Sequence, residues 1–178
     1  MRWRTQLAVV GALGALYLAG NVAFVRPVMD PHSVDRLNLA ALEELVAREP
    51  TNAVALRELT GRYLDLSMPS QLVIDVAQRA PAGTQRDGKV CLNVARAHEL
   101  LGGIEEGSRV ANAALNRCAN TPPELAGLYG CDVRVQTELA LLASALDRMI
   151  QWHISPVTDP RRAALAHDIA GRPIRIGP

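Results

Sequence analysis

Two patterns of apolar positions divide the sequence. Residues 5–25 contain no charged side chain, whereas from residue 27 onward apolar residues recur every three or four positions, as in helices with one buried face. No run alternates apolar and polar residues for long enough to require a strand. The pattern predicts an all-α protein whose N-terminal segment, residues 1–26, is separate from a helical remainder.

The N-terminal segment is long enough to cross a membrane. Its 21 uncharged residues would span about 32 Å as a helix, and the hydrocarbon core of a bilayer is about 30 Å thick. A cleavable signal peptide is the alternative, but Leu18-Ala19-Gly20 and Asn21-Val22-Ala23 each place a larger residue where the cut requires a small one. We expect a retained single-pass anchor in the cytoplasmic membrane. Because only four residues precede the span, the C-terminal part is expected outside the cytoplasm.

Seven helices are predicted after this segment, separated by short turns rich in Pro, Gly and small polar residues. Their expected ranges are 35–50, 51–66, 70–80, 87–101, 104–117, 132–152 and 159–170. Because the connections are short, neighbouring helices are expected to pack antiparallel. Leu165 and Ile169 are predicted to face inward in the last helix. The apolar stripe of the longest helix consists of Val135, Leu139, Leu142, Leu146, Met149 and Ile150.

The helical part repeats itself at a spacing of 35 residues. Four pairs align at this spacing: Leu56 with Cys91, Leu59 with Val94, Thr60 with Ala95, and Tyr63 with His98. A period near 34 residues, with one helix-turn-helix in each unit, is typical of a solenoid of helix pairs.

Residues 53–120 resemble two units of the tetratricopeptide repeat family. Pro50-Thr51-Asn52-Ala53 looks like the junction between two units of that family, and Ala95-Arg96-Ala97-His98-Glu99-Leu100-Leu101-Gly102 fits the end of a first helix. The resemblance implies a solenoid of two to three repeats over residues 27–120. Residues 35–50 would supply the second helix of a preceding unit. Residues 121–178 would then hold the C-terminal capping helices, chiefly 132–152, and a tail.

The repeats are degenerate. Leu72 stands where the family has a small residue, Pro69 replaces an aromatic residue of the turn, and Gly107 and Ala111 also depart from the pattern. The groove-lining residues of the family therefore cannot be transferred position by position. We choose candidate partner contacts by helical periodicity alone, as polar residues on the first helices of the units: Arg57, Arg62, Arg96 and Glu99.

Three cysteines bear on stability more than on chemistry. Cys118 and Cys131 flank the Pro122-Pro123 turn, and because the C-terminal part is expected in an oxidising compartment we expect them to form a disulfide. The alternative is that both are small buried hydrophobic residues. Cys91 lies on a helix face and is interpreted as a core residue.

Charge and composition exclude several classes of function. Lys+Arg number 19 and Asp+Glu number 18, and aromatic residues make up 3%, so neither a basic field nor a stacking surface for nucleic acid is expected. The sequence has no Cys-x2-Cys motif and no two histidines three or four residues apart, so no metal site or cofactor is predicted. Adjacent acidic pairs such as Glu43-Glu44 point in different directions on a helix and are interpreted as solvated.

The tetratricopeptide resemblance implies protein–protein binding, with a peptide or helix of the partner in a concave face, and no catalysis. We therefore expect a membrane-anchored adaptor or scaffold that binds a partner protein on the outer face of the cytoplasmic membrane. A structural subunit of a multi-protein envelope complex is the alternative. An enzyme with an unrecognised site is a further one.

Overall fold

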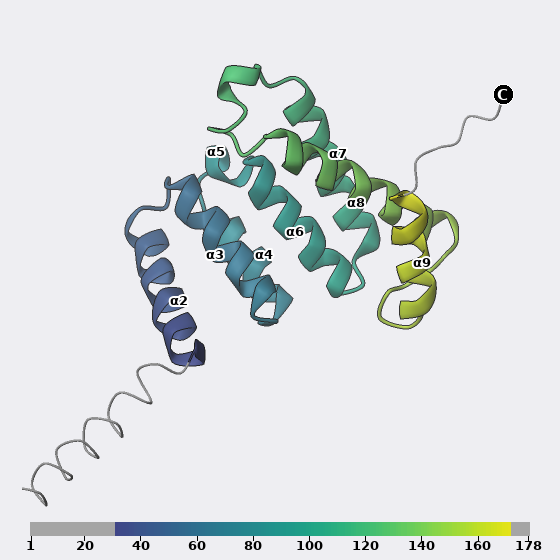
Figure 1. The fold of residues 1–178 in the computed structure, drawn as a ribbon, viewed down its shortest axis with the longest axis horizontal. Helices are drawn as coiled ribbons and strands as arrows, with labels where there is room; N and C mark the ends of the chain where they lie inside the picture. The colour runs from purple at the N-terminus through teal and green to yellow at the C-terminus, as the bar shows by residue number, and fades with distance from the viewer. Residues whose placement is uncertain (1–30, 172–178) are drawn as a thin grey trace, which may run out of the picture. The chain divides into compact units, whose positions relative to one another are not determined.

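The computed structural model describes residues 31–171, and within them every regular element is a helix, without a strand (Figure 1). The elements are α2 (Pro31–Arg48), α3 (Ala53–Asp65), α4 (Ser70–Arg79), α5 (Ala82–Gln85), α6 (Gly88–Leu100), α7 (Ile104–Ala119), the 3-10 turn η1 (Pro123–Leu125), α8 (Val133–Gln151) and α9 (Pro160–Ala170). The prediction of an all-α protein is confirmed for this part of the chain.

The chain divides into two compact units, residues 1–41 and 42–178. Helices α3 to α9 belong to the second unit, and α2 runs across the division. The predicted membrane span, residues 5–25, lies outside the described residues. Among the helices that are described, none has the length and apolar character needed to cross a bilayer. The predicted boundaries at residues 26 and 120, which separate the N-terminal segment, the repeats and the capping helices, stay predictions.

Side-chain caps set the beginnings of several helices. The carboxamide of Asn52 accepts a hydrogen bond from the Ala55 amide at the start of α3, and Asp132 does the same for Val135 in α8. After the C-terminal end of α6 the chain turns at Gly102, whose φ of +81° favours glycine. Together with the Pro, Gly and small polar residues of the other turns, these signals predicted the ends of all seven helices to within a few residues of the observed ends. The short helix α5 was missed.

The helices pack as a series of pairs. Within unit 42–178, α3 packs on α4, α6 on α7, and α8 on α9, while α6 also contacts α3 and α8. Figure 1 shows α3, α6 and α8 side by side, with α4 and α7 behind them. The first helices of successive pairs therefore share one face of this unit.

The main core lies where α6, α7, α8 and α9 meet. Leu139, Leu146 and Met149 of α8 are fully buried there, and alanines of α6 and α7 let the helices approach closely. This confirms the apolar stripe predicted for the longest helix, with Ile150 half-buried at its edge.

The predicted inward position was wrong for Leu165 of α9, whereas Ile169 is half-buried. Leu165 is 48% exposed, whereas Ala163 and Ala166 are buried in the core. The small side chains allow α9 to lie close to α8. The larger Leu165 lies on the exposed side of α9, so residue size is a better guide here than periodicity alone.

Candidate partner-binding face

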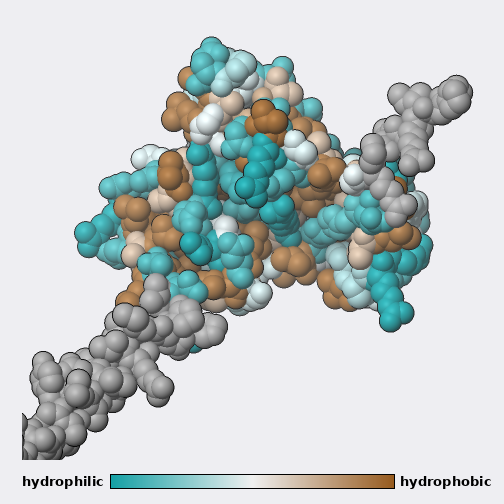
Figure 2. Space-filling view, in the orientation of Figure 1, coloured by the Kyte–Doolittle hydropathy of each residue, from teal (hydrophilic) through white to brown (hydrophobic). Residues whose placement is uncertain are grey.

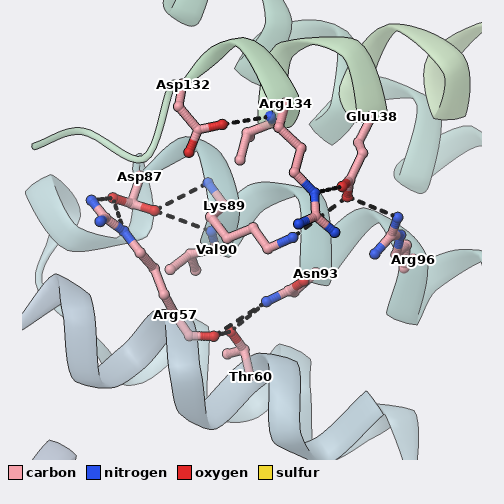
Figure 3. Close-up of polar contacts among 11 residues, drawn as sticks. Arg57, Thr60, Asp87, Lys89, Val90, Asn93, Arg96, Asp132, Arg134 and Glu138 are labelled. Atoms are coloured by element: carbon pink, nitrogen blue, oxygen red, sulfur yellow. Dashed lines mark hydrogen bonds and ion pairs between the residues drawn. The ribbon is translucent and has the colours of Figure 1, made fainter. Parts of the chain in front are cut away.

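Three cations converge on one carboxylate where α6 lies beside α8 (Figure 3). Glu138 Oε2 is 3.1 Å from Arg96 Nη2 and 3.5 Å from Lys89 Nζ, and Glu138 Oε1 is 2.9 Å from Arg134 Nε. Lys89 and Arg96 are two helical turns apart, and Arg134 precedes Glu138 by one turn. Lys89 and Arg96 therefore lie on one face of α6, and Arg134 and Glu138 lie on one face of α8. We call these four residues the cationic cluster.

The cationic cluster exposes its positive charges and shields its negative one. The side chain of Glu138 is 20% exposed, while that of Arg134 is 86% exposed and that of Arg96 is 42% exposed. Burial alone would raise the pKa of Glu138, but the hydrogen bond from Arg134 and the charges of Lys89 and Arg96 lower it below its ordinary value. The carboxylate thus stays ionised at neutral pH, and the cluster carries two net positive charges toward solvent.

A groove of about 390 Å³ continues from the cationic cluster between α6, α8 and α9. Arg96 and Glu138 belong to both the groove and the cluster, and the aliphatic side chains are Leu100, which is 61% exposed, Leu141, which is 40% exposed, and buried Leu142. The remaining lining residues are Glu99, His167 and Gly171. We call this feature the α6–α9 groove. It places exposed aliphatic groups beside exposed cations.

One ion pair ties α9 to α6 along this groove. His167 Nε2 lies 2.5 Å from Glu99 Oε1, and the carboxylate of this pair is 13% exposed. The hydrogen bond that the His167 imidazole donates to Glu99, together with the charge of Glu99, raises the pKa of His167 above its ordinary value, against the opposing effects of burial and Arg96. The pair links α9 to α6 along one wall of the groove.

Arg57 has a different environment from the cationic cluster. Its guanidinium donates to Asp87 Oδ2, with Nη2 at 2.5 Å, and to the carbonyl oxygens of Gly127 and Leu128. Asp87 is 3% exposed and also caps α6 by accepting from the amides of Lys89 and Val90. Arg57 thus fastens α3 to the start of α6, as Figure 3 shows, and also to the loop before α8.

That loop is closed by a disulfide between Cys118 and Cys131, as the sequence predicted. The disulfide packs directly on the first residue of α6. A Cβ atom added at Gly88 would lie 2.7 Å from Cys118 Sγ and 2.5 Å from the Gly130 carbonyl oxygen. Only glycine fits at this contact.

Cys91, one turn further along α6, is free and buried, and burial raises the pKa of its thiol.

The structure brings together two of the four residues predicted to contact a partner. Arg96 and Glu99 both line the α6–α9 groove. Arg57 lies at the disulfide loop, and Arg62 forms an ion pair of 3.0 Å with Glu58 on the exposed side of α3. Four residues of the face were not singled out from the sequence: Lys89, Arg134, Glu138 and His167. The spacing of Lys89 and Arg96 is a usable signal, whereas the convergence of α6 on α8 is not visible in the sequence.

The face combines charged and aliphatic side chains. Its groups are cations, one shielded carboxylate, a histidine–glutamate pair and aliphatic side chains. In the described part of the chain, no group of three or more His, Cys, Asp or Glu side chains is arranged to hold a metal ion. Comparison of the chain with protein-family models, with curated proteins and with solved structures gives no match.

Proposed function

We propose that this protein is a membrane-tethered, tetratricopeptide-like adaptor that binds a segment of a partner protein in the α6–α9 groove. The observation that carries the proposal is the groove itself, in which exposed Leu100 and Leu141 adjoin exposed cations. Exposed aliphatic side chains beside an oriented polar cluster are typical of surfaces that bury a partner.

The arrangement of helix pairs supports the tetratricopeptide part of this proposal. α3 with α4 and α6 with α7 correspond to the two units separated by 35 residues, and each first helix packs on the first helix of the next pair. The pair α8 and α9 follows in the same manner, so the predicted C-terminal cap would be a third pair. Such a series presents its first helices on one face, which is where the groove lies.

Crosslinking in cells tests the binding site. A photoreactive amino acid at Leu141, inside the groove, should capture one defined protein. The same amino acid at Gln151, which is exposed on the same helix outside the groove, serves as the matched control. Equal capture from both positions, or no capture from Leu141, would contradict the proposal.

The tether rests on the uncharged stretch 5–25 and is tested separately. A cysteine introduced at exposed Gln71 should react with a membrane-impermeant maleimide in intact cells, and the buried Cys91 should not. The chain should also remain in the membrane fraction after washing at high pH. Protection of the introduced cysteine until lysis would contradict the proposed orientation.

A permanent structural subunit is the second candidate, and the disulfide loop favours it. Leu128 is 66% exposed, Tyr129 51% and Val133 81%, and such side chains suit an interface that is never opened. A stable complex of fixed stoichiometry after mild detergent extraction would support this candidate over an exchanging adaptor.

A further inference from the structure

We infer that the segment bound in the α6–α9 groove is acidic at one end and aliphatic at the other, with its carboxylates on Lys89, Arg96 and Arg134 and a leucine-sized side chain against Leu100 and Leu141. The inference rests on the proposed function and names the chemistry of the partner.

The first argument is the net positive charge of the cationic cluster. Three cations surround the one carboxylate of Glu138, and this carboxylate lies beneath them, because its side chain is 20% exposed. Glu138 fixes the direction of the cations without neutralising them. A carboxylate of a partner can approach the exposed side of Arg96 and Arg134, where charge-assisted hydrogen bonds to guanidinium groups are favourable.

The second argument is that the other charges of the groove are already paired. Glu99, which would repel an acidic partner, is 13% exposed and forms its ion pair with His167. The charge available to a partner is therefore positive at the cluster end of the groove and close to neutral at the α9 end. A basic segment would meet exposed cations and would find no free carboxylate among the residues that line this groove.

The third argument is the position of the aliphatic residues. Leu100 follows Arg96 by one turn on α6, and Leu141 follows Glu138 by about one turn on α8. Both leucines are exposed although they lie beside the core residue Leu142. Covering them removes apolar surface from water, which gives the bound segment an anchor in addition to its charges.

The distance between the cationic end and the aliphatic end of the site limits the length of the bound segment. Lys89 and Leu100 are eleven residues apart on one helix, which corresponds to about 16 Å at roughly 1.5 Å per residue. An extended peptide covers this distance in about five residues at roughly 3.3 Å each. The probe is therefore a peptide with two glutamates and, five residues away, one leucine, made in both chain orders.

The test measures binding of these fluorescein-labelled peptides to the full chain in detergent micelles by fluorescence anisotropy. At least one order should bind, and the affinity should fall as NaCl rises from about 50 to 300 mM, because the cations are partly exposed. Replacing both glutamates by glutamine should weaken binding about tenfold, and replacing leucine by serine about fivefold. Equal binding of a lysine-for-glutamate peptide would overturn the inference.

Matched variants locate the site. Arg134→Gln and Arg96→Gln, singly and together, should reduce affinity by about threefold each and tenfold together. Arg62→Gln removes an exposed arginine that lies in neither the cluster nor the groove, and should change affinity less than twofold. Circular dichroism melting of each variant confirms folding. The salt dependence and the peptide series on the unmodified chain need no variant.

Two further outcomes are decisive. If a heparin fragment, a polyanion without aliphatic groups, displaces the peptide as well as unlabelled peptide does, the site selects charge alone and the inference fails. If neither peptide order binds while Leu141 still captures a partner in cells, the inference fails and the adaptor function stands. If Leu141 captures nothing and the peptide binds with the stated dependence, the groove chemistry is supported and the cellular role is not.

Discussion

The α3–α4 pair and the four helices α6–α9 bury their apolar faces to different degrees. In α6–α9 one continuous core joins all four helices, and a disulfide closes the loop between α7 and α8. In α3–α4, Leu56, Leu59 and Val73 are buried, but Leu72 is 37% exposed beside an open groove of about 420 Å³. The buried residues of α3–α4 lie outside that continuous core, and Glu43, Val46 and Ala47 of α2 also line the groove.

Polar contacts connect these two regions. Asn93 Nδ2 on α6 donates to Thr60 Oγ1 on α3 at 2.9 Å, and both side chains are buried (Figure 3). Together with the Arg57–Asp87 pair, this bond sets the register of α3 on α6. On the face seen in Figure 2, hydrophilic and apolar residues are intermixed over the described helices, so the exposed apolar groups there form small areas. The α3–α4 pair is thus attached by specific contacts and has the less complete core.

The largest expected difference between the regions concerns two buried leucines. Leu146→Ala in α8 should lower the free energy of unfolding by about 4 kcal/mol, because Leu146 is fully buried in the continuous core. Leu59→Ala in α3 should cost about 2 kcal/mol, because Leu59 lines the open α3–α4 groove, where neighbours can relax. Urea unfolding followed by circular dichroism measures both. Equal costs would contradict the contrast.

The disulfide should contribute somewhat less than Leu146. Cys118 and Cys131 are 13 residues apart, and closing a loop of this size stabilises a fold by about 3 kcal/mol through the unfolded chain. The double variant Cys118→Ala/Cys131→Ala should unfold at correspondingly lower urea concentration. Addition of a reductant should reproduce this shift in the unmodified protein and leave the double variant unchanged.

Gly88 tests the contact between the disulfide and α6. Gly88→Ala should destabilise by about 2 kcal/mol, because the new methyl group would lie 2.7 Å from Cys118 Sγ and 2.5 Å from the Gly130 carbonyl oxygen. Gly83→Ala is the matched control, since an added Cβ meets nothing within 4 Å there. Thermal melting compares the two. A harmless Gly88→Ala would show that the loop can move away from α6.

The smallest expected effect is the pH dependence of the α9 wall. The folded-state pKa of His167 is raised above 6.5 by Glu99, so the pair stabilises the fold fully below that value and less as pH rises through the raised pKa. The contribution should be about 0.5 kcal/mol, as for a partly exposed pair.

The measurement compares the unfolding free energy of the unmodified protein with that of His167→Gln. The difference should shrink between about pH 5.5 and pH 8.5. Glu99→Gln should lower the pKa of His167 as followed by nuclear magnetic resonance. A difference that grows with pH would reverse the sign of the linkage.

Local signals explain how much of the fold could be predicted. Asn52 and Asp132 cap their helices through contacts within three residues, and the backbone conformation of Gly102 ends α6. These helix boundaries depend on neighbouring residues only, so they could be predicted from the sequence. Helix α5 was missed because Pro81-Ala82-Gly83 also fits a turn.

The candidate site depended on contacts between distant residues. Arg96 and Glu99 could be found because periodicity places them on an exposed face of one helix. Glu138 accepts from Lys89, 49 residues away, and His167 meets Glu99 at a separation of 68 residues. Periodicity indicates which side of a helix is exposed, but it does not indicate which helix lies opposite.

The contacts of Arg57 have a consequence for the order of synthesis. Its guanidinium bonds to carbonyl oxygens 70 and 71 residues further along the chain. A ribosome adds about 5 to 20 residues per second, so Arg57 is synthesised roughly 4 to 14 s before the residues that carry these carbonyl groups. The contact that fastens α3 to the loop before α8 can therefore form only after Leu128 has been made.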